Sequence, residues 1–146
     1  MAIIALLALM TIPVYLQRNL QLQVKDGLVF ADFVKKAVAA SFAMNGVLPA
    51  DNAAAGLPAP DKIVGSIVTA VTVNNGVVTI TYGNLAVSNI SGKRLTLQPA
   101  YVADSPQVPV SWVCGLARTP SGLTVAGSNG TDIPNDWLPV GCRKES

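Results

Sequence analysis

The chain has 146 residues, a length typical of one domain with its own hydrophobic core. Only 12% of the residues are charged and 51% are hydrophobic, so a soluble monomer of this composition would tend to associate. The net charge of +2 is too small to indicate binding to nucleic acid or to anionic lipid. The sequence contains no histidine, which removes the commonest general base and metal ligand.

Residues 1–17 carry no charged side chain, and the first ionised residue is Arg18. The run is a few residues shorter than the about 20 apolar residues that span a membrane. It also lacks the basic start and the cleavage site of a signal peptide. We therefore expect the recorded sequence to begin part-way along a longer hydrophobic helix. A single-pass membrane anchor and an oligomerisation stalk are both compatible with this run.

Beyond Arg18 the apolar residues recur at steps of three or four, which predicts an amphipathic helix. They are Leu20, Val24, Leu28, Ala31, Val34, Val38 and Phe42. We expect one helix over residues 1–44, about 60 Å long, in which residues 1–17 protrude and residues 18–44 pack on the rest of the chain. Pro13 is expected to break its backbone hydrogen bonding, and Gly27 to weaken it.

Residues 45–146 form the remainder of the domain, in which the apolar period changes from helical to two. Residues 47–65, rich in proline, glycine and alanine, predict an exposed connecting loop, and the tail after Arg118 predicts irregular structure. The predicted strands are 67–73, 77–82, 94–98 and 108–116, the first two joined by a turn at residues 74–76. The predicted fold class is α+β, with a long N-terminal helix on a four-stranded antiparallel sheet.

Cys114 and Cys142 flank a segment rich in glycine, proline, serine and asparagine. Such a pair indicates one disulfide and an oxidising compartment, whereas two reduced thiols in a cytosolic domain are the alternative. The bridge would stabilise the fold by roughly 3–4 kcal/mol. Two cysteines without histidine cannot complete a tetrahedral zinc site.

No motif predicts an enzyme, a cofactor site or a metal site. A Ser-His-Asp arrangement is excluded, and neither a phosphate-binding loop nor a dinucleotide fingerprint is present. The basic pairs are scattered without aromatic residues between them, which favours solvated surface over a nucleic-acid site. The aspartates in the predicted loops are expected to be solvated carboxylates: Asp51, Asp61, Asp104, Asp132 and Asp136.

Four segments, taken together, resemble the type IVa pilins. Residues 2–8 and 12–15 resemble the conserved family helix as it passes through its proline, and residues 71–80 resemble the first hairpin of the family. Residues 110–114 resemble its tryptophan-x-cysteine strand, and residues 137–143 resemble its closing leucine-proline and cysteine-arginine segment. The phenylalanine-led stretch with a glutamate that begins processed family members has no match here.

The resemblance implies the type IV pilin fold and a structural subunit of a type IV pilus, with adhesion, twitching motility and DNA uptake as its uses. Cys114 and Cys142 would bound the loop exposed on the filament. The residues implied to pack in the filament core are Ala2, Ile3, Ile4, Leu6, Leu7, Leu9, Met10, Ile12, Pro13 and Leu16.

The implied partners are other copies of the chain, the inner membrane before assembly, the pilus assembly machinery, and a host surface or DNA. The implied location is a bacterial surface filament. Two alternatives remain open. One is a minor pilin or pseudopilin, and the other is a membrane-anchored periplasmic binding module, which would be a monomer in detergent.

Overall fold

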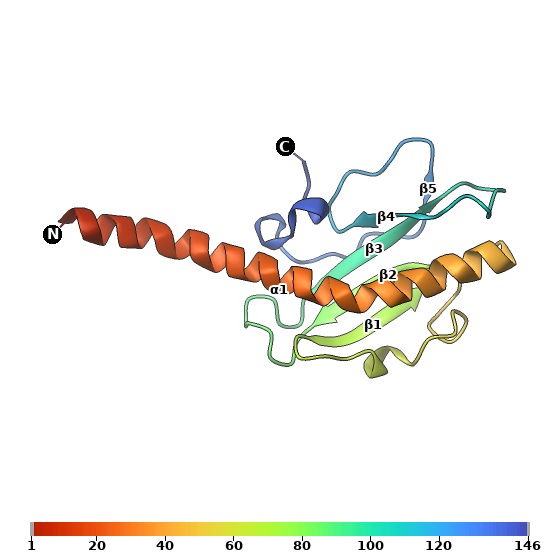
Figure 1. Ribbon diagram of the computed structural model, residues 1–146, viewed down its shortest axis with the longest axis horizontal. Helices are drawn as coiled ribbons and strands as arrows, with labels where there is room; N and C mark the ends of the chain where they lie inside the picture. The colour runs from red at the N-terminus through yellow and green to blue at the C-terminus, as the bar shows by residue number, and fades with distance from the viewer. Residues whose placement is uncertain (1, 146) are drawn as a thin grey trace.

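The computed structural model describes residues 2–145, with side chains from residue 14 onwards, and consists of one long helix lying on an antiparallel sheet (Figure 1). The N-terminal part of the helix extends beyond the sheet. The elements are α1 (Ala2–Asn45), β1 (Val68–Asn74), β2 (Val77–Tyr82), β3 (Arg94–Tyr101), β4 (Ser111–Cys114) and β5 (Thr124–Val125), with 3-10 turns at Pro60–Lys62, Asn135–Trp137 and Val140–Cys142.

Helix α1 buries the face that its sequence pattern predicts. The residues of this inner face are Leu20, Val24, Ala31, Val34, Val38 and Phe42, each at most 4% exposed. The first five pack against Val71, Ile80 and Leu95 of the sheet in one hydrophobic core, and the Phe42 ring contacts the Tyr101 ring of β3 with 5.1 Å between the centroids. The predicted break at Pro13 is wrong for the backbone, because α1 runs through it without interruption. A proline removes only one ladder donor, and the hydrogen bonds of the adjoining turns keep the helix continuous.

Gly27 lies where a strand side chain touches the backbone of α1. A Cβ added at Gly27 would come within 2.6 Å of the Tyr82 hydroxyl oxygen and would overlap the ring. The buried Tyr82 hydroxyl donates a hydrogen bond of 2.7 Å to the Val24 carbonyl oxygen. Glycine therefore lets the β2 tyrosine lie directly on the helix, which compensates for the low helix propensity of this residue.

The sheet has the strand order β1-β2-β3-β4, with the short β5 also paired to β3. Asn74 pairs with Val77, so the predicted turn narrows to Asn75 and Gly76, whose φ angles of 48° and 85° suit a two-residue hairpin. Strand β3 runs past the predicted end at residue 98. Pro99 is accommodated because it lies beyond the last β2 pair, Val78 with Leu97. Its carbonyl accepts a hydrogen bond from the Ala126 N–H.

Strand β3 is buried on both faces, which the alternating sequence did not indicate. On the face away from α1, Thr96 is 2% and Gln98 is 8% exposed. The tail segment covers them: the Gln98 amide donates to the Ala126 carbonyl at 3.0 Å, and the Gly130 N–H donates to the Thr96 hydroxyl at 3.1 Å. The tail is therefore mostly irregular, as predicted, but it contains the short strand β5 and two 3-10 turns and is held in place by side-chain hydrogen bonds.

The connection between α1 and β1 is anchored by one buried asparagine, so the prediction of a wholly exposed loop is wrong at this point. Asn52 is 3% exposed. Its amide donates to the carbonyls of Pro58 and Val71, both at 3.0 Å, and its side-chain oxygen accepts from the Val73 N–H at 2.7 Å. Asn52 thereby satisfies backbone groups of β1, the first strand of the sheet, where no further strand follows.

Candidate functional site

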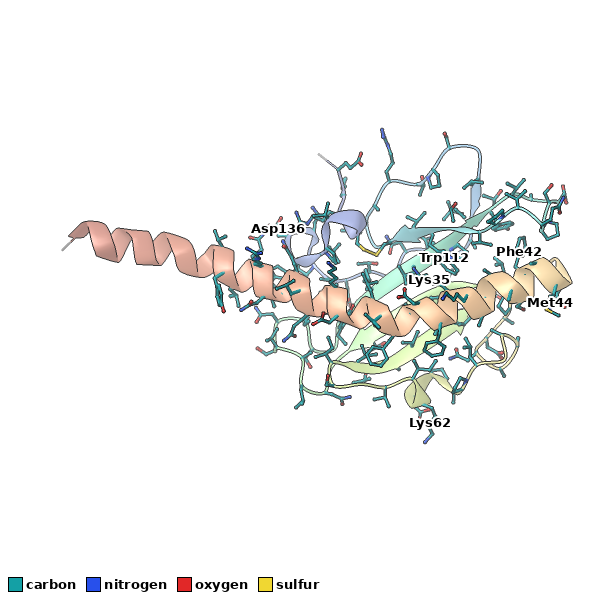
Figure 2. The ribbon with its side chains drawn as sticks, in the orientation of Figure 1. Lys35, Phe42, Met44, Lys62, Trp112 and Asp136 are labelled. Carbon is teal, nitrogen blue, oxygen red and sulfur yellow. A yellow bond between two sulfur atoms is a disulfide. The ribbon has the colours of Figure 1, made fainter. Side chains whose placement is uncertain are left out.

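A second apolar stripe runs along the side of α1 that faces away from the sheet. We call Leu22, Val29, Phe33, Ala40 and Met44 the outer stripe; all five are exposed. At 3.6 residues per turn they fall within an arc of about 60°, opposite the inner face. Met44 and the inner-face residue Phe42 project from opposite sides of the helix (Figure 2). No segment within residues 14–145 covers the outer stripe, although it includes side chains as large as Phe33, which is 46% exposed.

The part of α1 that is buried by the rest of the chain begins between Leu16 and Leu20. These two residues are one turn apart on the same side of the helix, yet Leu16 is 46% and Leu20 is 1% exposed. All residues from 14 to 19 are exposed, including Val14 and Tyr15 at 67% each. The apolar side chains of Val14, Tyr15 and Leu16 are thus exposed where the helix leaves the domain, and Arg18, slightly further along, lies beside the C-terminal segment.

Of the residues expected to pack in a filament core, the structure describes the side chain of Leu16 alone. The side chains of the others lie outside the described residues; these are Ala2, Ile3, Ile4, Leu6, Leu7, Leu9, Met10, Ile12 and Pro13. In the part of the chain that the structure describes, no helical stretch is long and apolar enough to cross a membrane.

Sequence reasoning missed the outer stripe. The helical period was assigned to a single apolar face, with Arg18, Gln21, Lys25, Asp26, Asp32 and Lys35 on the other faces. The signal was nevertheless present, because Leu22, Val29 and Phe33 are spaced seven and four residues apart, as residues on one side of a helix are. Only the packing of the sheet shows which of the two stripes remains uncovered.

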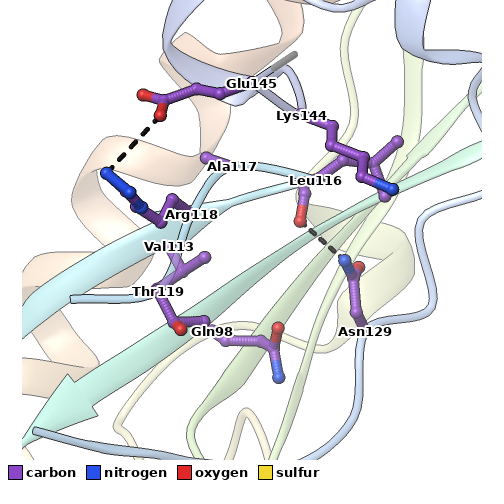
Figure 3. A pocket seen from close by; sticks show the side chains of 10 residues that line it. Gln98, Val113, Leu116, Ala117, Arg118, Thr119, Asn129, Lys144 and Glu145 are labelled. Carbon is purple, nitrogen blue, oxygen red and sulfur yellow. Dashed lines mark hydrogen bonds and ion pairs between the residues drawn. The ribbon is translucent and has the colours of Figure 1, made fainter. Parts of the chain in front are cut away.

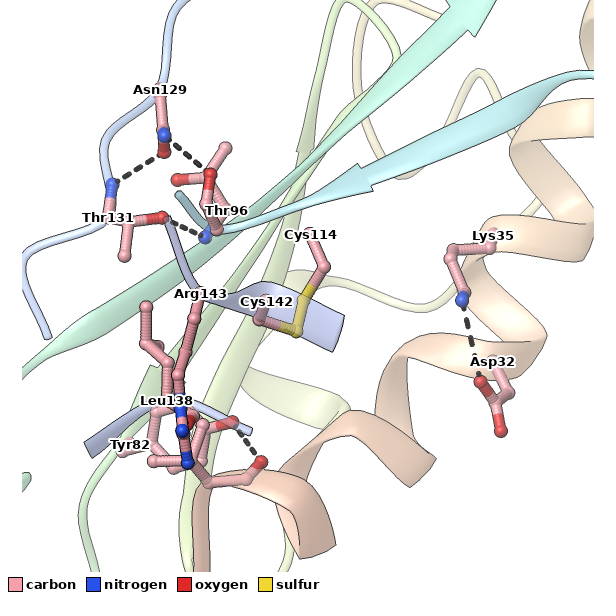
Figure 4. Close-up of a disulfide and its surroundings, with 12 residues drawn as sticks. Asp32, Lys35, Tyr82, Thr96, Cys114, Asn129, Thr131, Leu138, Cys142 and Arg143 are labelled. Atoms are coloured by element: carbon pink, nitrogen blue, oxygen red, sulfur yellow. Dashed lines mark hydrogen bonds and ion pairs between the residues drawn. A yellow bond between two sulfur atoms is a disulfide. The ribbon is translucent and has the colours of Figure 1, made fainter. Parts of the chain in front are cut away.

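The predicted disulfide between Cys114 and Cys142 is present (Figure 4). It ties the end of β4 to the last 3-10 turn of the chain, and Cys142 is buried in the core. Next to it, the Arg143 Nε donates to the Leu138 carbonyl at 2.7 Å. The bridge and this hydrogen bond fix a segment with little regular structure of its own.

A hollow lies beside this bridge, on the face of the sheet away from α1 (Figure 3). It has a volume of about 650 Å³, and its lining includes Gln98, Val113, Leu116 and Lys144. Asn129 borders it and donates to the Gly115 carbonyl at 2.6 Å. The side chains of Gln98, Asn129 and Lys144 can form hydrogen bonds, but the lining of this hollow includes no nucleophile paired with a base.

The acidic residues of the described chain do not gather into a site. The five loop aspartates are exposed, as predicted: Asp51, Asp61, Asp104, Asp132 and Asp136. Within the described residues, no group of three acidic, histidine or cysteine side chains is placed to hold a metal ion. The chemically distinctive surface is therefore the apolar one on α1.

Comparison with known proteins decides the family. The model of a family described as pilin, a bacterial filament protein, matches residues 23–143. The chain is 34% identical to a type IV major pilin protein PilE1 of Neisseria gonorrhoeae, over 97% of this chain and 86% of the relative. A fimbrial protein of Neisseria meningitidis serogroup B is 32% identical, over 99% and 88%, respectively. The fimbrial protein EcpC of Eikenella corrodens is 37% identical over 66% of this chain and 65% of its own length.

The chain belongs to the pilin family. The inferred resemblance is confirmed, and so is the type IV pilin fold of a long N-terminal helix on an antiparallel sheet with a C-terminal disulfide. Like other pilins, this one is a structural subunit of a surface filament and not an enzyme.

The segments that carried the resemblance occupy distinct places in this pilin. Residues 71–80 lie in the β1–β2 hairpin, and Trp112 and Cys114 lie in β4. Trp137 ends the 3-10 turn Asn135–Trp137, and Cys142 ends the last one. Trp112 and Trp137 pack partly against the hydrophobic core, so these motif residues contribute to the fold of the domain.

Proposed function

We propose that this pilin is the major subunit of a type IV pilus and that its N-terminal helices pack together to form the filament core. One observation carries the proposal: α1 leaves the sheet with apolar side chains exposed, and its outer stripe stays uncovered over the length of the domain. Neighbouring copies would bury this surface, which stabilises by roughly 25 cal/mol for each Å² removed from water.

The residues proposed to pack in the filament core lie on α1 before the inner face begins. From Ala2 to Leu16 the sequence contains no charged side chain, so helices of neighbouring copies can pack without burying unpaired charge. Alanines at positions 2, 5 and 8 would allow close approach between helices. Before assembly, the same run would hold the subunit in the inner membrane, from which the assembly machinery would take it.

We propose adhesion, twitching motility and DNA uptake as uses of the assembled filament. The disulfide-bounded region supports a role in surface contact, because its residues 126–130 cover the face of the sheet away from α1 and so would face outwards in the filament. Relatives named as major pilins, similar over nearly the whole chain, support the major subunit over the minor one.

The experiment introduces a charge into the proposed core. The change Leu6→Arg should abolish filaments in sheared surface preparations viewed by electron microscopy, while the globular domain keeps its circular dichroism spectrum and melting temperature. Leu6→Met is the matched control, because it keeps an apolar side chain of similar volume and should assemble normally. Normal filaments from Leu6→Arg would contradict assembly through this helix.

One observation favours a second function, a membrane-anchored periplasmic binding module. The hollow of about 650 Å³ beside the disulfide has the size of a small-molecule site. This function predicts a monomer in detergent and no fibres in the same preparations. A minor pilin or pseudopilin predicts fibres in which the chain is a small fraction of the protein, as quantified by mass spectrometry.

A further inference from the structure

At the end of the domain from which the apolar part of α1 emerges, the helix and the C-terminal segment enclose a hollow of about 310 Å³. We call it the basal groove. Three of its lining residues are cations, Arg18 and Lys25 from α1 and Arg143 from the C-terminal segment, and none is acidic. Arg18 and Lys25 lie seven residues apart and therefore on the same side of the helix.

One hydrogen bond joins the two walls of the basal groove, and a second orients a cation within one wall. The Gln21 side-chain amide donates to the Asp136 carbonyl oxygen at 2.7 Å, which fixes the C-terminal segment to α1. The Arg143 Nε donates to the Leu138 carbonyl at the same distance, which orients its guanidinium group. The exposed carboxylates of Asp26 and Asp136 adjoin these residues, but neither lines the groove.

The cations of the basal groove lack an acidic partner within the described chain. Three other cations form ion pairs at 3.7–3.9 Å: Lys35 with Asp32, Arg94 with Asp132 and Arg118 with Glu145. By contrast, Arg18, Lys25 and Arg143 have no described carboxylate oxygen within 4.0 Å. Three positive charges that line one hollow without a counter-charge repel one another, and an anion between them relieves that repulsion.

The place of the groove along α1 indicates which anion it holds. Arg18 is the first ionised residue after the uncharged run, so the groove lies where the helix would leave a bilayer. The phosphates of lipids lie at this surface of the bilayer, and one guanidinium group can donate two parallel hydrogen bonds to phosphate oxygens. Leu22, 49% exposed, and Val140, 82% exposed, add an apolar side to the groove.

We propose that the basal groove binds the phosphate of an anionic phospholipid while the subunit is anchored in the membrane. The inference rests on the proposed membrane-held pool. The overall charge of +2 gave no sign of such a site, because the site depends on three cations brought together by folding and not on their total number.

The test is a competition between two vesicle populations for the full chain, diluted from detergent. One population is phosphatidylcholine alone, and the other is phosphatidylcholine mixed with phosphatidylglycerol. The groove variant carries Arg18→Gln, Lys25→Gln and Arg143→Gln. The matched control carries Lys35→Gln, Lys36→Gln and Lys62→Gln, which removes the same charge from outside the groove; Lys35 and Lys36 lie about 15 Å beyond Lys25 along the helix.

The wild-type chain should prefer the vesicles that contain phosphatidylglycerol. The groove variant should lose about fivefold of that preference for each cation removed. The control should lose less than about twofold in all, because charges beyond a Debye length of about 10 Å from the surface are screened. Equal losses in the two variants, or no preference in the wild type, would overturn the proposal. The pilus function is tested separately by filament formation. If the lipid test fails but filaments form, only the lipid site is overturned.

Two further measurements make the result specific to the groove. Phosphatidylglycerol with a photoreactive headgroup should crosslink to peptides that contain residues 18–25 and 139–143, and crosslinks elsewhere alone would overturn the proposal. Inorganic phosphate added to the chain in lipid-free micelles should bind weakly, and binding as tight as that of the lipid would assign the groove to free phosphate instead. If the triple variant does not fold, the double variant Arg18→Gln with Lys25→Gln replaces it, because it leaves the Arg143 hydrogen bond intact. Its control is then Lys36→Gln with Lys62→Gln.

Discussion

Both sides of α1 carry large apolar side chains over the length of the sheet, but only those of the inner face are covered, and the outer stripe shares its side of the helix with charged residues such as Asp26 and Lys36. On the inner face, Val34 and Val38 are completely buried. On the outer stripe, Val29 is 67% and Met44 is 84% exposed. Packing of the inner face is enough to attach α1 to the sheet, so the outer stripe is not required for the fold of the subunit. It is therefore available for contacts between molecules.

The comparison separates folding from assembly within one helix. Changes to the inner face should alter the free energy of unfolding of the single subunit. Changes to the outer stripe should leave that free energy almost unchanged and act on the filament. Two adjacent residues can lie one on the inner face and the other on the outer stripe, so the same substitution at both positions tests whether folding and assembly are separate.

The largest effect is expected from a charge on the inner face. Val34→Asp would bury an unpaired carboxylate and should destabilise the domain by more than about 4 kcal/mol, as measured by denaturant unfolding. Phe33→Asp, one residue away on the outer stripe, should change stability by less than about 1 kcal/mol yet prevent filament formation. Similar losses of stability in both variants would show that the two faces are not distinct.

Removal of the disulfide should have the next largest effect. Replacing Cys114 and Cys142 by serine frees a segment with a sequence separation of 28 and should cost about 3–4 kcal/mol. Thermal unfolding of the variant beside the wild type, with and without reductant, measures the loss. Reductant should destabilise the wild type alone. An unchanged melting temperature would mean that the hydrogen bonds of the tail hold it without the bridge.

A methyl group at Gly27 tests the close contact on the inner face. Gly27→Ala improves helix propensity by about 1 kcal/mol but forces the Tyr82 ring away, so a net destabilisation of about 1–3 kcal/mol is expected. Gly141→Ala is the control, because a Cβ there meets no atom within 4 Å. A more stable Gly27→Ala variant in denaturant would show that the ring can move at little cost.

The smallest effect is expected at the Tyr82 hydroxyl. Tyr82→Phe removes its hydrogen bond to Val24 and should cost about 1 kcal/mol at neutral pH. Burial, with a smaller contribution from Asp26, raises the pKa of Tyr82 well above its usual value of 10.0. The folded chain therefore keeps this proton when the unfolded chain loses it, so the wild type should lose stability as the pH rises above 10.0. The phenylalanine variant should show a shallower alkaline loss, and identical slopes would contradict this assignment.

The sequence determined the elements whose signals are local. The hairpin followed from alternation around Asn75 and Gly76, and the long helix from its apolar period, because each depends on residues close together in the chain. The disulfide could be predicted from two cysteines that flank a segment with little regular secondary structure.

The tertiary structure decided what depends on distant neighbours. The burial of Thr96 and Gln98, the anchoring of the loop by Asn52 and the fit of Tyr82 on Gly27 all join segments far apart in the sequence. The exposure of the outer stripe is also decided by the tertiary structure. Periodicity can show that a helix has apolar stripes, but which stripe is free depends on where the sheet packs, and that is a property of the folded chain alone.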